Sequence, residues 1–330
     1  MRIGECFILG FHGYELPNWI RDFENKFGLG GVILFDYYCQ TKKYEMNVET
    51  PEQLKKLTAQ VHSLASRPLV VIDQEGGKVR RLKESRGFAP LRSQWTFSQA
   101  PREVREAEAR VSYREMRALG VDMNLAPVVD LNSNPENPNI GKVERSFSAD
   151  PRVVRENVEL LAKVAREEGM MLCLKHYPGL GGASVNSHDE FTDLSQCHSA
   201  QEEEIFYDLA PTIPGEAVLV GHGVIHDWES GVPISVSAAG IGRLRGCLPE
   251  ALILSDDLQM QGLQFKYGSL EASRLGLSAG LDLVLVGNNM LNKEEECFGY
   301  AESLTKNLER DALLRERVSS AIARVARRKS

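Results

Sequence analysis

Two carboxylates stand close to the ends of short apolar runs, where they could do chemistry. Asp256 follows the run Leu252–Leu254, and Asp73 comes directly after Leu69–Ile72. An ionised carboxylate at the end of a buried strand can act as a nucleophile or as a metal ligand. Each position also has a plainer interpretation. Asp257, the neighbour of Asp256, could cap a following helix, and Asp73 could be a solvated acid in a tight turn, because a Gly–Gly pair lies just beyond it.

Basic and imidazole side chains follow other runs. Lys175 and His176 come directly after Met170–Leu174, which favours a functional role for the pair over a purely structural one. The glycine- and serine-rich stretch beyond them is expected to form a loop and carries His188. Arg145 lies in another long loop, where it could clamp a carbonyl or hydroxyl group or simply pair with surface acids.

These residues share one setting, because each lies on or near a segment that follows an apolar run. Most of the runs have four to seven residues rich in Val, Ile and Leu, which is typical of strands buried on both faces. Segments with helical spacing lie between them. The alternation predicts an α/β protein, a single-domain (β/α)8 barrel over residues 1–330, with its active site at the C-terminal ends of the strands. The runs are Cys6–Phe11, Gly31–Phe35, Leu69–Ile72, Met123–Val129, Met170–Leu174, Ala217–Val220, Leu252–Leu254 and, with the weakest fit, Leu281–Val286.

Two helix boundaries are legible in the sequence. Thr50 and Asp150 each precede a proline, which predicts a side-chain N-cap followed by proline in the first turn. Gly169 is expected to end the second of these helices, because glycine readily adopts the left-handed conformation that closes a helix.

The composition excludes several classes of protein. The chain has 330 residues, 42% hydrophobic and 26% charged, which is ordinary for a globular domain. Its net charge of −7 does not favour binding to nucleic acid or to an anionic membrane. The basic C-terminus is explained as cations that stabilise the end of a last helix. We expect no signal peptide, and no apolar run approaches the ~20 residues of a membrane span. The six cysteines form no C-x-x-C pair, which favours free thiols and a cytoplasmic location.

Four motifs resemble one known family. They are Asp73–Gly77, Lys175–Gly179, Asn186–His188 and Ser255–Met260. Together, and in this order, they are similar to the family 3 glycoside hydrolases, and more narrowly to the short, single-domain bacterial β-N-acetylglucosaminidases (β-hexosaminidases). The resemblance spans nearly the whole chain. It implies one family 3 N-terminal-type TIM-like barrel domain, a small N-acetylglucosaminide as substrate, and neither cofactor nor metal.

The resemblance also implies roles for individual residues. Asp256 would be the nucleophile that forms a covalent glycosyl-enzyme, and His188 would be the acid/base. Asp73 would accept hydrogen bonds from sugar hydroxyls. The expected activity is retaining, exo-acting hydrolysis of terminal β-N-acetylglucosaminides such as muropeptides. The residues that would hold the sugar ring are Arg81, Arg145, Lys175 and His176.

The chain departs from the family motif in the catalytic loop. Leu180 stands where the motif has a second histidine, and Asn186 stands where it has the aspartate that partners the catalytic His188. Asparagine can accept a hydrogen bond and fix a tautomer, but it cannot stabilise an imidazolium by charge. Asp189 or Asp193 could replace that aspartate if the loop is rearranged.

Two alternative functions stay open. A sugar-binding or weakly active homologue would have kept the pocket and lost efficient acid/base catalysis, which Asn186 favours. A metal-dependent barrel hydrolase would use His176, His222 and an acid; His222 and His226 also have a metal-like spacing. A zinc measurement on the purified protein would separate this second alternative from the glycosidase. In the glycosidase reaction, phosphate could also replace water as the acceptor of the glycosyl group.

Overall fold

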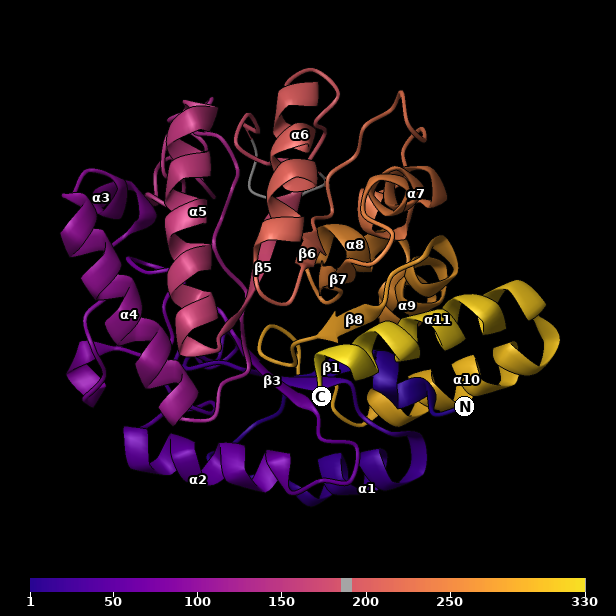
Figure 1. The fold of residues 1–330 in the computed structure, drawn as a ribbon. Coiled ribbons are helices and arrows are strands. Elements are labelled where there is room, and N and C mark those ends of the chain that lie inside the picture. The colour runs from indigo at the N-terminus through magenta and orange to yellow at the C-terminus, as the bar shows by residue number, and fades with distance from the viewer. Residues whose placement is uncertain (185–191, 330) are drawn as a thin grey trace.

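The computed structural model describes residues 1–184 and 192–329 (Figure 1). Within them, parallel strands follow one another in sequence order and close into a barrel, because β8 pairs with β1. The predicted (β/α)8 barrel is therefore confirmed. The strands are β1 Phe7–Leu9, β2 Gly31–Leu34, β3 Leu69–Ile72, β4 Met123–Asn124, β5 Met171–Tyr177, β6 Ala217–Val220, β7 Leu252–Asp257 and β8 Leu283–Val286.

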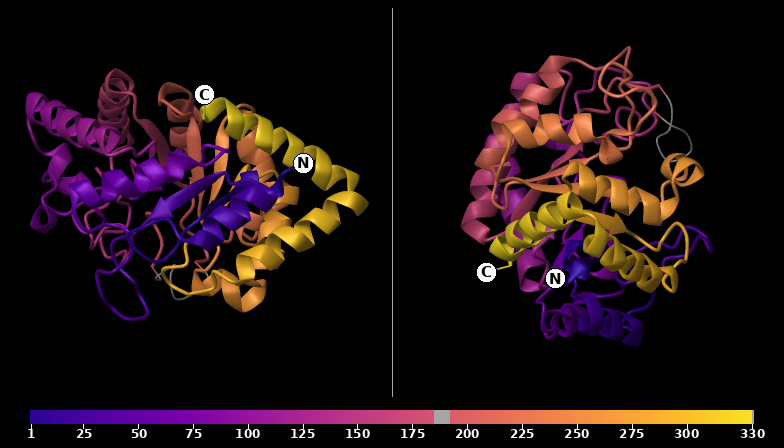
Figure 2. Two further views of the ribbon diagram at one scale, coloured as in Figure 1. Left: turned by 90° about the horizontal axis from the view of Figure 1, so that it is seen from below. Right: turned by 90° about the vertical axis from the view of Figure 1, so that its right-hand side faces the viewer.

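Helices surround the barrel, as Figure 1 and the two turned views of Figure 2 show. Short 3-10 turns add to them: η1 Ile3–Cys6, η2 Glu84–Arg86, η3 Ala210–Thr212 and η4 Ile234–Val236. None of the helices in the described ranges is long and apolar enough to cross a membrane. The α-helices are α1 Asn18–Phe27, α2 Pro51–His62, α3 Gln94–Ser98, α4 Arg102–Ala118, α5 Pro151–Glu168, α6 Ala200–Leu209, α7 Ala238–Cys247, α8 Gln261–Lys266, α9 Gly268–Ala279, α10 Glu296–Arg310 and α11 Ala312–Arg328.

The helix boundaries form as the sequence predicts. The Thr50 side chain accepts a hydrogen bond from the Gln53 backbone N–H at the start of α2, and Asp150 accepts one from Arg152 at the start of α5. Gly169 ends α5 with a φ of 70°, in the left-handed region. These caps fix where each helix begins and ends relative to the neighbouring strand.

Apolar side chains fill two layers. Alternate strand residues such as Val71, Leu219 and Leu285 fill the barrel interior, and the residues between them pack outward against the helices. Cys6 and Cys173 are buried free thiols, and free thiols are what the sequence favours. Burial raises the pKa of both thiols well above the usual range.

Several strand boundaries differ from the predicted runs. The run Met123–Val129 is a strand only over Met123–Asn124, since Pro127 within it has no N–H to give to a ladder. By contrast, β5 continues through Lys175 and His176, and β7 continues through Asp256 and Asp257. These polar residues therefore lie at the C-terminal ends of their strands and not in the loops that follow.

Asp257 joins β7 to β8 and does not cap a helix, because the N-cap of α8 is Met260. Its Oδ1 accepts the backbone N–H groups of Gln259 at 3.0 Å and of Gly287, directly after β8, at 3.1 Å. Its Oδ2 is buried without a hydrogen-bond partner among the described residues. Burial raises the pKa of Asp257 to about 7, and the nearby charge of Asp256 adds to the effect.

This raised pKa predicts a pH-dependent contribution to stability. Between the ordinary value of 3.8 and about 7 the folded state keeps a proton that the unfolded state releases, so stability falls as pH rises through this range. Asp257→Asn cannot ionise. Its unfolding free energy, measured with denaturant at pH 5 and pH 8, should therefore rise relative to that of the wild type on going to pH 8. The matched control is Asp22→Asn, at an exposed aspartate. Equal shifts for the two variants would contradict this account.

Candidate active site

A cavity of about 550 Å³ opens at the C-terminal ends of the strands. Its volume suits a sugar-sized ligand, and its wall combines apolar residues with a few convergent charges. Figure 1 labels β3, β5 and β7, whose ends carry Asp73, Lys175 and Asp256 of the cavity wall. The charged residues that line it are Asp73, Arg81, Lys175, Asp256 and Asp257.

Asp73 is held by two cations. Its Oδ1 lies 2.7 Å from Lys175 Nζ, and its Oδ2 lies 3.1 Å from Arg81 Nη2. Burial opposes ionisation, but Lys175 and Arg81 outweigh it and hold the pKa of Asp73 well below its usual range. The Arg81 guanidinium also stacks on the Phe35 ring, 5.2 Å from its centroid. Asp73 is therefore an ionised acceptor with a fixed orientation.

Glu75 extends the cluster deeper into the protein. Arg145 grips it in a bidentate pair, with Nε–Oε2 at 2.7 Å and Nη2–Oε1 at 2.9 Å. Lys175 Nζ is 2.5 Å from the same Oε1. Although burial acts in the opposite direction, Arg145 and Lys175 lower the pKa of Glu75 to about 2. Burial opposes the charged form of Lys175, but Asp73 and Glu75 outweigh it and raise the pKa of Lys175, so the ammonium stays charged.

His176 is fixed from both sides. Arg145 Nη2 lies 3.0 Å from Nε2, and Asp130 Oδ2 lies 2.7 Å from Nδ1. Because a guanidinium can only donate, Nε2 accepts and Nδ1 carries the hydrogen that is donated to Asp130. Asp130 Oδ1 also accepts the backbone N–H groups of His176 and Leu180. Both ring nitrogens of His176 are thus engaged within the protein, and His176 is not among the residues that line the cavity of about 550 Å³.

Asp256 stands at the end of β7, partly exposed to the cavity. Its Oδ1 accepts the backbone N–H of Asp257 at 2.8 Å. The strand pairing shifts register between Leu254 and Asp257, and again in β5 between Leu174 and Tyr177. Such irregularities re-aim side chains at the rims of barrels. They occur here at the segments that hold Asp256, Lys175 and His176.

His188 and Asn186, the predicted acid/base and its partner, lie outside the described residues, as does Asp189. The described residues before and after this segment are held by hydrogen bonds. Asn137 donates to the Leu180 carbonyl at 2.7 Å, and Leu194 N–H donates to the Val224 carbonyl at 2.8 Å.

Asp193, the other proposed substitute for an aspartate partner, has contacts of its own. It accepts the Ser195 backbone N–H at 2.9 Å, and its Oδ2 lies 3.7 Å from His226 Nε2.

Sequence reasoning gave no role to three carboxylates that organise the site. Glu75 lies within the motif Asp73–Gly77, while Asp36 and Asp130 each follow an apolar run, so their positions indicate the active-site end of the barrel but not their roles. Asp36 is buried, 2.7 Å from Lys83 Nζ and 3.8 Å from Arg81 Nη1. Because their partners come from distant segments, only the folded chain reveals which cation each one orients.

The histidines considered as metal ligands have other contacts. His222 Nδ1 is 2.7 Å from the Ser235 hydroxyl, and its Nε2 is 2.9 Å from the Asp257 carbonyl. Burial lowers the pKa of His222. In the described part of the chain, no three or more His, Cys, Asp or Glu side chains are placed to hold a metal ion.

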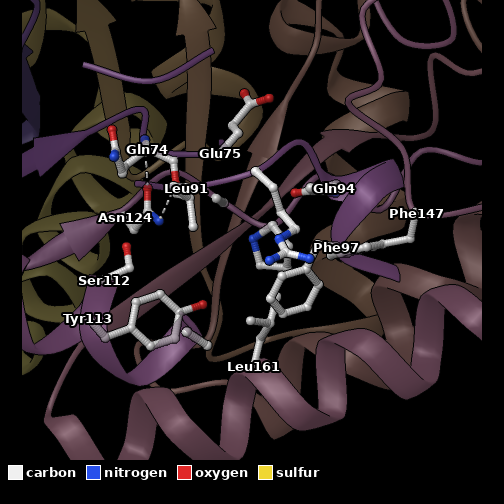
Figure 3. Close-up of a pocket in the computed structure, with 14 residues that line it drawn as sticks. Gln74, Glu75, Leu91, Gln94, Phe97, Ser112, Tyr113, Asn124, Phe147 and Leu161 are labelled. Atoms are coloured by element: carbon white, nitrogen blue, oxygen red, sulfur yellow. Dashed lines mark hydrogen bonds between the residues drawn. The ribbon is translucent and has the colours of Figure 1, made fainter. Parts of the chain in front are cut away.

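A second cavity lies behind Glu75, between the barrel and helices α3, α4 and α5 (Figure 3). In the figure, Gln74 and Asn124 are hydrogen-bonded to each other at its edge, while Tyr113 and Leu161 form the helical side. The volume of about 30 Å³ suits water and is too small for a sugar. Of these two cavities, only the one at the strand ends is large enough for a sugar.

Comparison with known proteins agrees with this geometry. Residues 15–328 match the model of the glycosyl hydrolase family 3 N-terminal domain. A β-hexosaminidase from Xanthomonas oryzae pv. oryzae is 32% identical over 293 residues, covering 84% of this chain and 82% of that protein. One from Bordetella avium is 32% identical over 279 residues, covering 79% and 74%.

A solved structure is also similar. The family 3 β-N-acetylglucosaminidase from Paenibacillus sp. superimposes with a TM-score of 0.86 at 26% identity. The match covers 99% of this chain but 62% of the Paenibacillus protein. Since the family model spans nearly the whole sequence and the β-hexosaminidases align over most of their length, the chain belongs to glycosyl hydrolase family 3 and is a glycoside hydrolase.

Proposed function

We propose that this protein is a retaining, exo-acting β-N-acetylglucosaminidase. The observation that carries the proposal is the placement of Asp256 in the same cavity wall as the fixed pair Asp73–Lys175. Asp256 supplies a nucleophile, while Asp73 supplies a hydrogen-bond acceptor and Lys175 a hydrogen-bond donor for hydroxyl groups. The names of the Xanthomonas β-hexosaminidase and the Paenibacillus β-N-acetylglucosaminidase support the choice of sugar.

In this proposal the charged cluster binds the sugar ring. Asp73 accepts hydrogen bonds from sugar hydroxyls, and Arg81 and Lys175 donate to sugar oxygens. Arg145 and His176 hold these groups in place through Glu75. Hydrogen bonds to charged groups contribute about 1.5–3 kcal/mol each, so a few of them suffice to orient one monosaccharide. The groups are already ionised and paired, so little reorganisation accompanies binding.

The chemical steps follow the retaining mechanism. Asp256 attacks the anomeric carbon as the glycosidic bond breaks, and the leaving oxygen takes a proton from the acid/base. Water then gives a proton to the same group and attacks the anomeric carbon, which releases Asp256. By the family motif the acid/base is His188, whose unperturbed pKa near 6.5 suits both donation and acceptance. An assay with and without phosphate would show whether phosphate replaces water in the second step.

The proposed natural substrates are muropeptides in the cytoplasm, where terminal N-acetylglucosamine is removed during cell-wall turnover. The family resemblance supports the substrate, and cysteine usage supports the compartment. A second candidate function is a sugar-binding protein with weak turnover. It is favoured by one specific observation, which is Asn186 in place of the aspartate that partners the catalytic histidine.

Asp256→Ala tests the proposed function. Turnover of nitrophenyl N-acetyl-β-glucosaminide should fall by several powers of ten, because the covalent route is lost, while calorimetric binding of N-acetylglucosamine stays close to wild type. Added azide should restore turnover by attacking the anomeric carbon directly, which gives the α-glycosyl azide.

Asp208→Asn, at an exposed aspartate on α6, is the matched control and should keep full activity. If Asp256→Ala retained more than about a tenth of the wild-type rate, a loss under 1.4 kcal/mol in the barrier, Asp256 would not be the nucleophile.

Asn186→Asp tests the acid/base assignment. If Asn186 faces His188, the imidazolium is less stabilised here than with an aspartate partner, and leaving groups that need protonation suffer most. Restoring the acid should raise turnover of an N-acetylglucosamine disaccharide more than turnover of the nitrophenyl glycoside. The measurement is the ratio of the two kcat/KM values in wild type and variant.

Nitrophenolate leaves with little protonation, so the nitrophenyl substrate serves as the internal control. A disaccharide that the wild type already cleaves at a comparable rate, with no gain from Asn186→Asp, would mean that another group fills the partner's role.

A further inference from the structure

A third cavity lies at the opposite end of the barrel from the proposed active site. It has a volume of about 560 Å³ and is formed by residues at the N-terminal ends of β3 and β5, by the end of α4 and by the end of α11. The proposed glycosidase chemistry makes no use of it. Its lining residues are His62, Arg67, Pro68, Leu69, Arg117, Asp122, Gly169, Met171, Arg328 and Lys329.

Positive charge is concentrated in this cavity. Arg67, Arg117, Arg328 and Lys329 line it against one carboxylate, Asp122, although the whole chain carries a net charge of −7. The four cations come from separate segments: the turn before β3, helix α4, and the end of α11 and the residue after it. Folding, rather than a basic run of sequence, therefore brings most of them together.

The single carboxylate is already engaged. Asp122 Oδ2 lies 2.8 Å from His62 Nε2 and accepts the Val70 backbone N–H at 2.9 Å. Its Oδ1 lies 3.0 Å from Arg117 Nη1. Asp122 thus balances the charge on the α4 side and leaves the other cations of the cavity to be compensated elsewhere.

Carbonyl groups, more than acids, hold the cations at the end of α11. Arg328 donates to the carbonyls of Gly215 and Glu250, both at 2.9 Å, and pairs with Glu216 at 3.1 Å. Lys329 Nζ donates to the carbonyls of Leu29 at 2.8 Å and Ser66 at 3.2 Å. These hydrogen bonds connect the end of α11 to segments that precede several strands. The cations therefore do more than stabilise the end of the last helix, which is the role expected from the sequence. Burial lowers the pKa of Lys329 to about 8, although Glu5 and Glu24 act in the opposite direction.

Arg67 has the clearest unused binding capacity. Its exposed guanidinium makes no side-chain hydrogen bond or ion pair with any residue in the described ranges. Its φ of 44° lies in the left-handed region, which non-glycine residues rarely adopt. Backbone in a disfavoured conformation is found preferentially at ligand clamps and other functional sites.

We propose that this cavity binds a small anion that carries a diphosphate group. Guanidinium groups match phosphate oxygens with paired donors, and the ammonium of Lys329 adds a point charge. The volume admits pyrophosphate with room for an organic substituent, and Pro68, Leu69 and Met171 give that substituent an apolar wall. The concave shape suits a small molecule rather than a nucleic-acid backbone.

Calorimetry with inorganic pyrophosphate at constant ionic strength tests the proposal. The wild type should bind one equivalent saturably, and Arg67→Glu should weaken binding ten-fold or more, the loss expected for a charge-assisted hydrogen bond. A nucleoside diphosphate forms the second arm. Tighter binding than pyrophosphate would assign a substituted diphosphate to the cavity, and equal binding would assign the free anion.

The matched control is Arg102→Glu, at an exposed arginine at the start of α4, about 22 Å along the helix from Arg117. It should bind pyrophosphate as the wild type does. Glycosidase activity of Arg67→Glu should be unchanged, which shows that the fold is intact. No saturable binding by the wild type would overturn the proposal, as would equal weakening in Arg67→Glu and Arg102→Glu.

Discussion

The structure of the proposed active site depends on one buried ammonium. Lys175, with 3% of its side chain exposed, lies 2.7 Å from Asp73 and 2.5 Å from Glu75. A charge removed from water is strongly destabilising unless it is paired, and a broken buried pair costs about 3–5 kcal/mol. The ends of β3 and β5 are therefore locked together. Through Glu75 the same constraint reaches Arg145, and through Arg145 it reaches His176.

Local irregularities in an otherwise regular barrel position this network of charged residues. Regular parallel pairing would send successive side chains alternately inward and outward. The register shifts between Leu174 and Tyr177 and between Leu254 and Asp257 break that alternation at the strand ends. The left-handed glycines Gly76 and Gly77 turn the chain after β3, where the Cβ of any other residue at Gly76 would approach the Arg92 carbonyl to 2.0 Å. The pocket thus depends on backbone features as much as on side chains.

Much of this arrangement could be predicted from the sequence, because local patterns determine it. Apolar runs predict the strands, and capping residues such as Thr50 predict the helix starts. The residues that follow the runs, among them Asp73, predict which side chains lie at one end of the barrel. The bridging role of Glu75 could not be predicted in this way, since its partners lie 70 and 100 residues further along the chain. The alternation of apolar runs and helical segments also does not reveal that Lys175 lies within β5 and not after it.

Glu75→Gln measures most directly whether this buried charge network positions the sugar-binding groups. The amide keeps the shape of Glu75 but leaves Arg145 and Lys175 without their shared counter-charge. The account predicts that calorimetric affinity for N-acetylglucosamine falls ten-fold or more, or about 1.5–3 kcal/mol, in a protein that still folds. Glu84→Gln, at an acid with 53% side-chain exposure in the same loop, should bind as the wild type does. Wild-type affinity in Glu75→Gln would contradict the account.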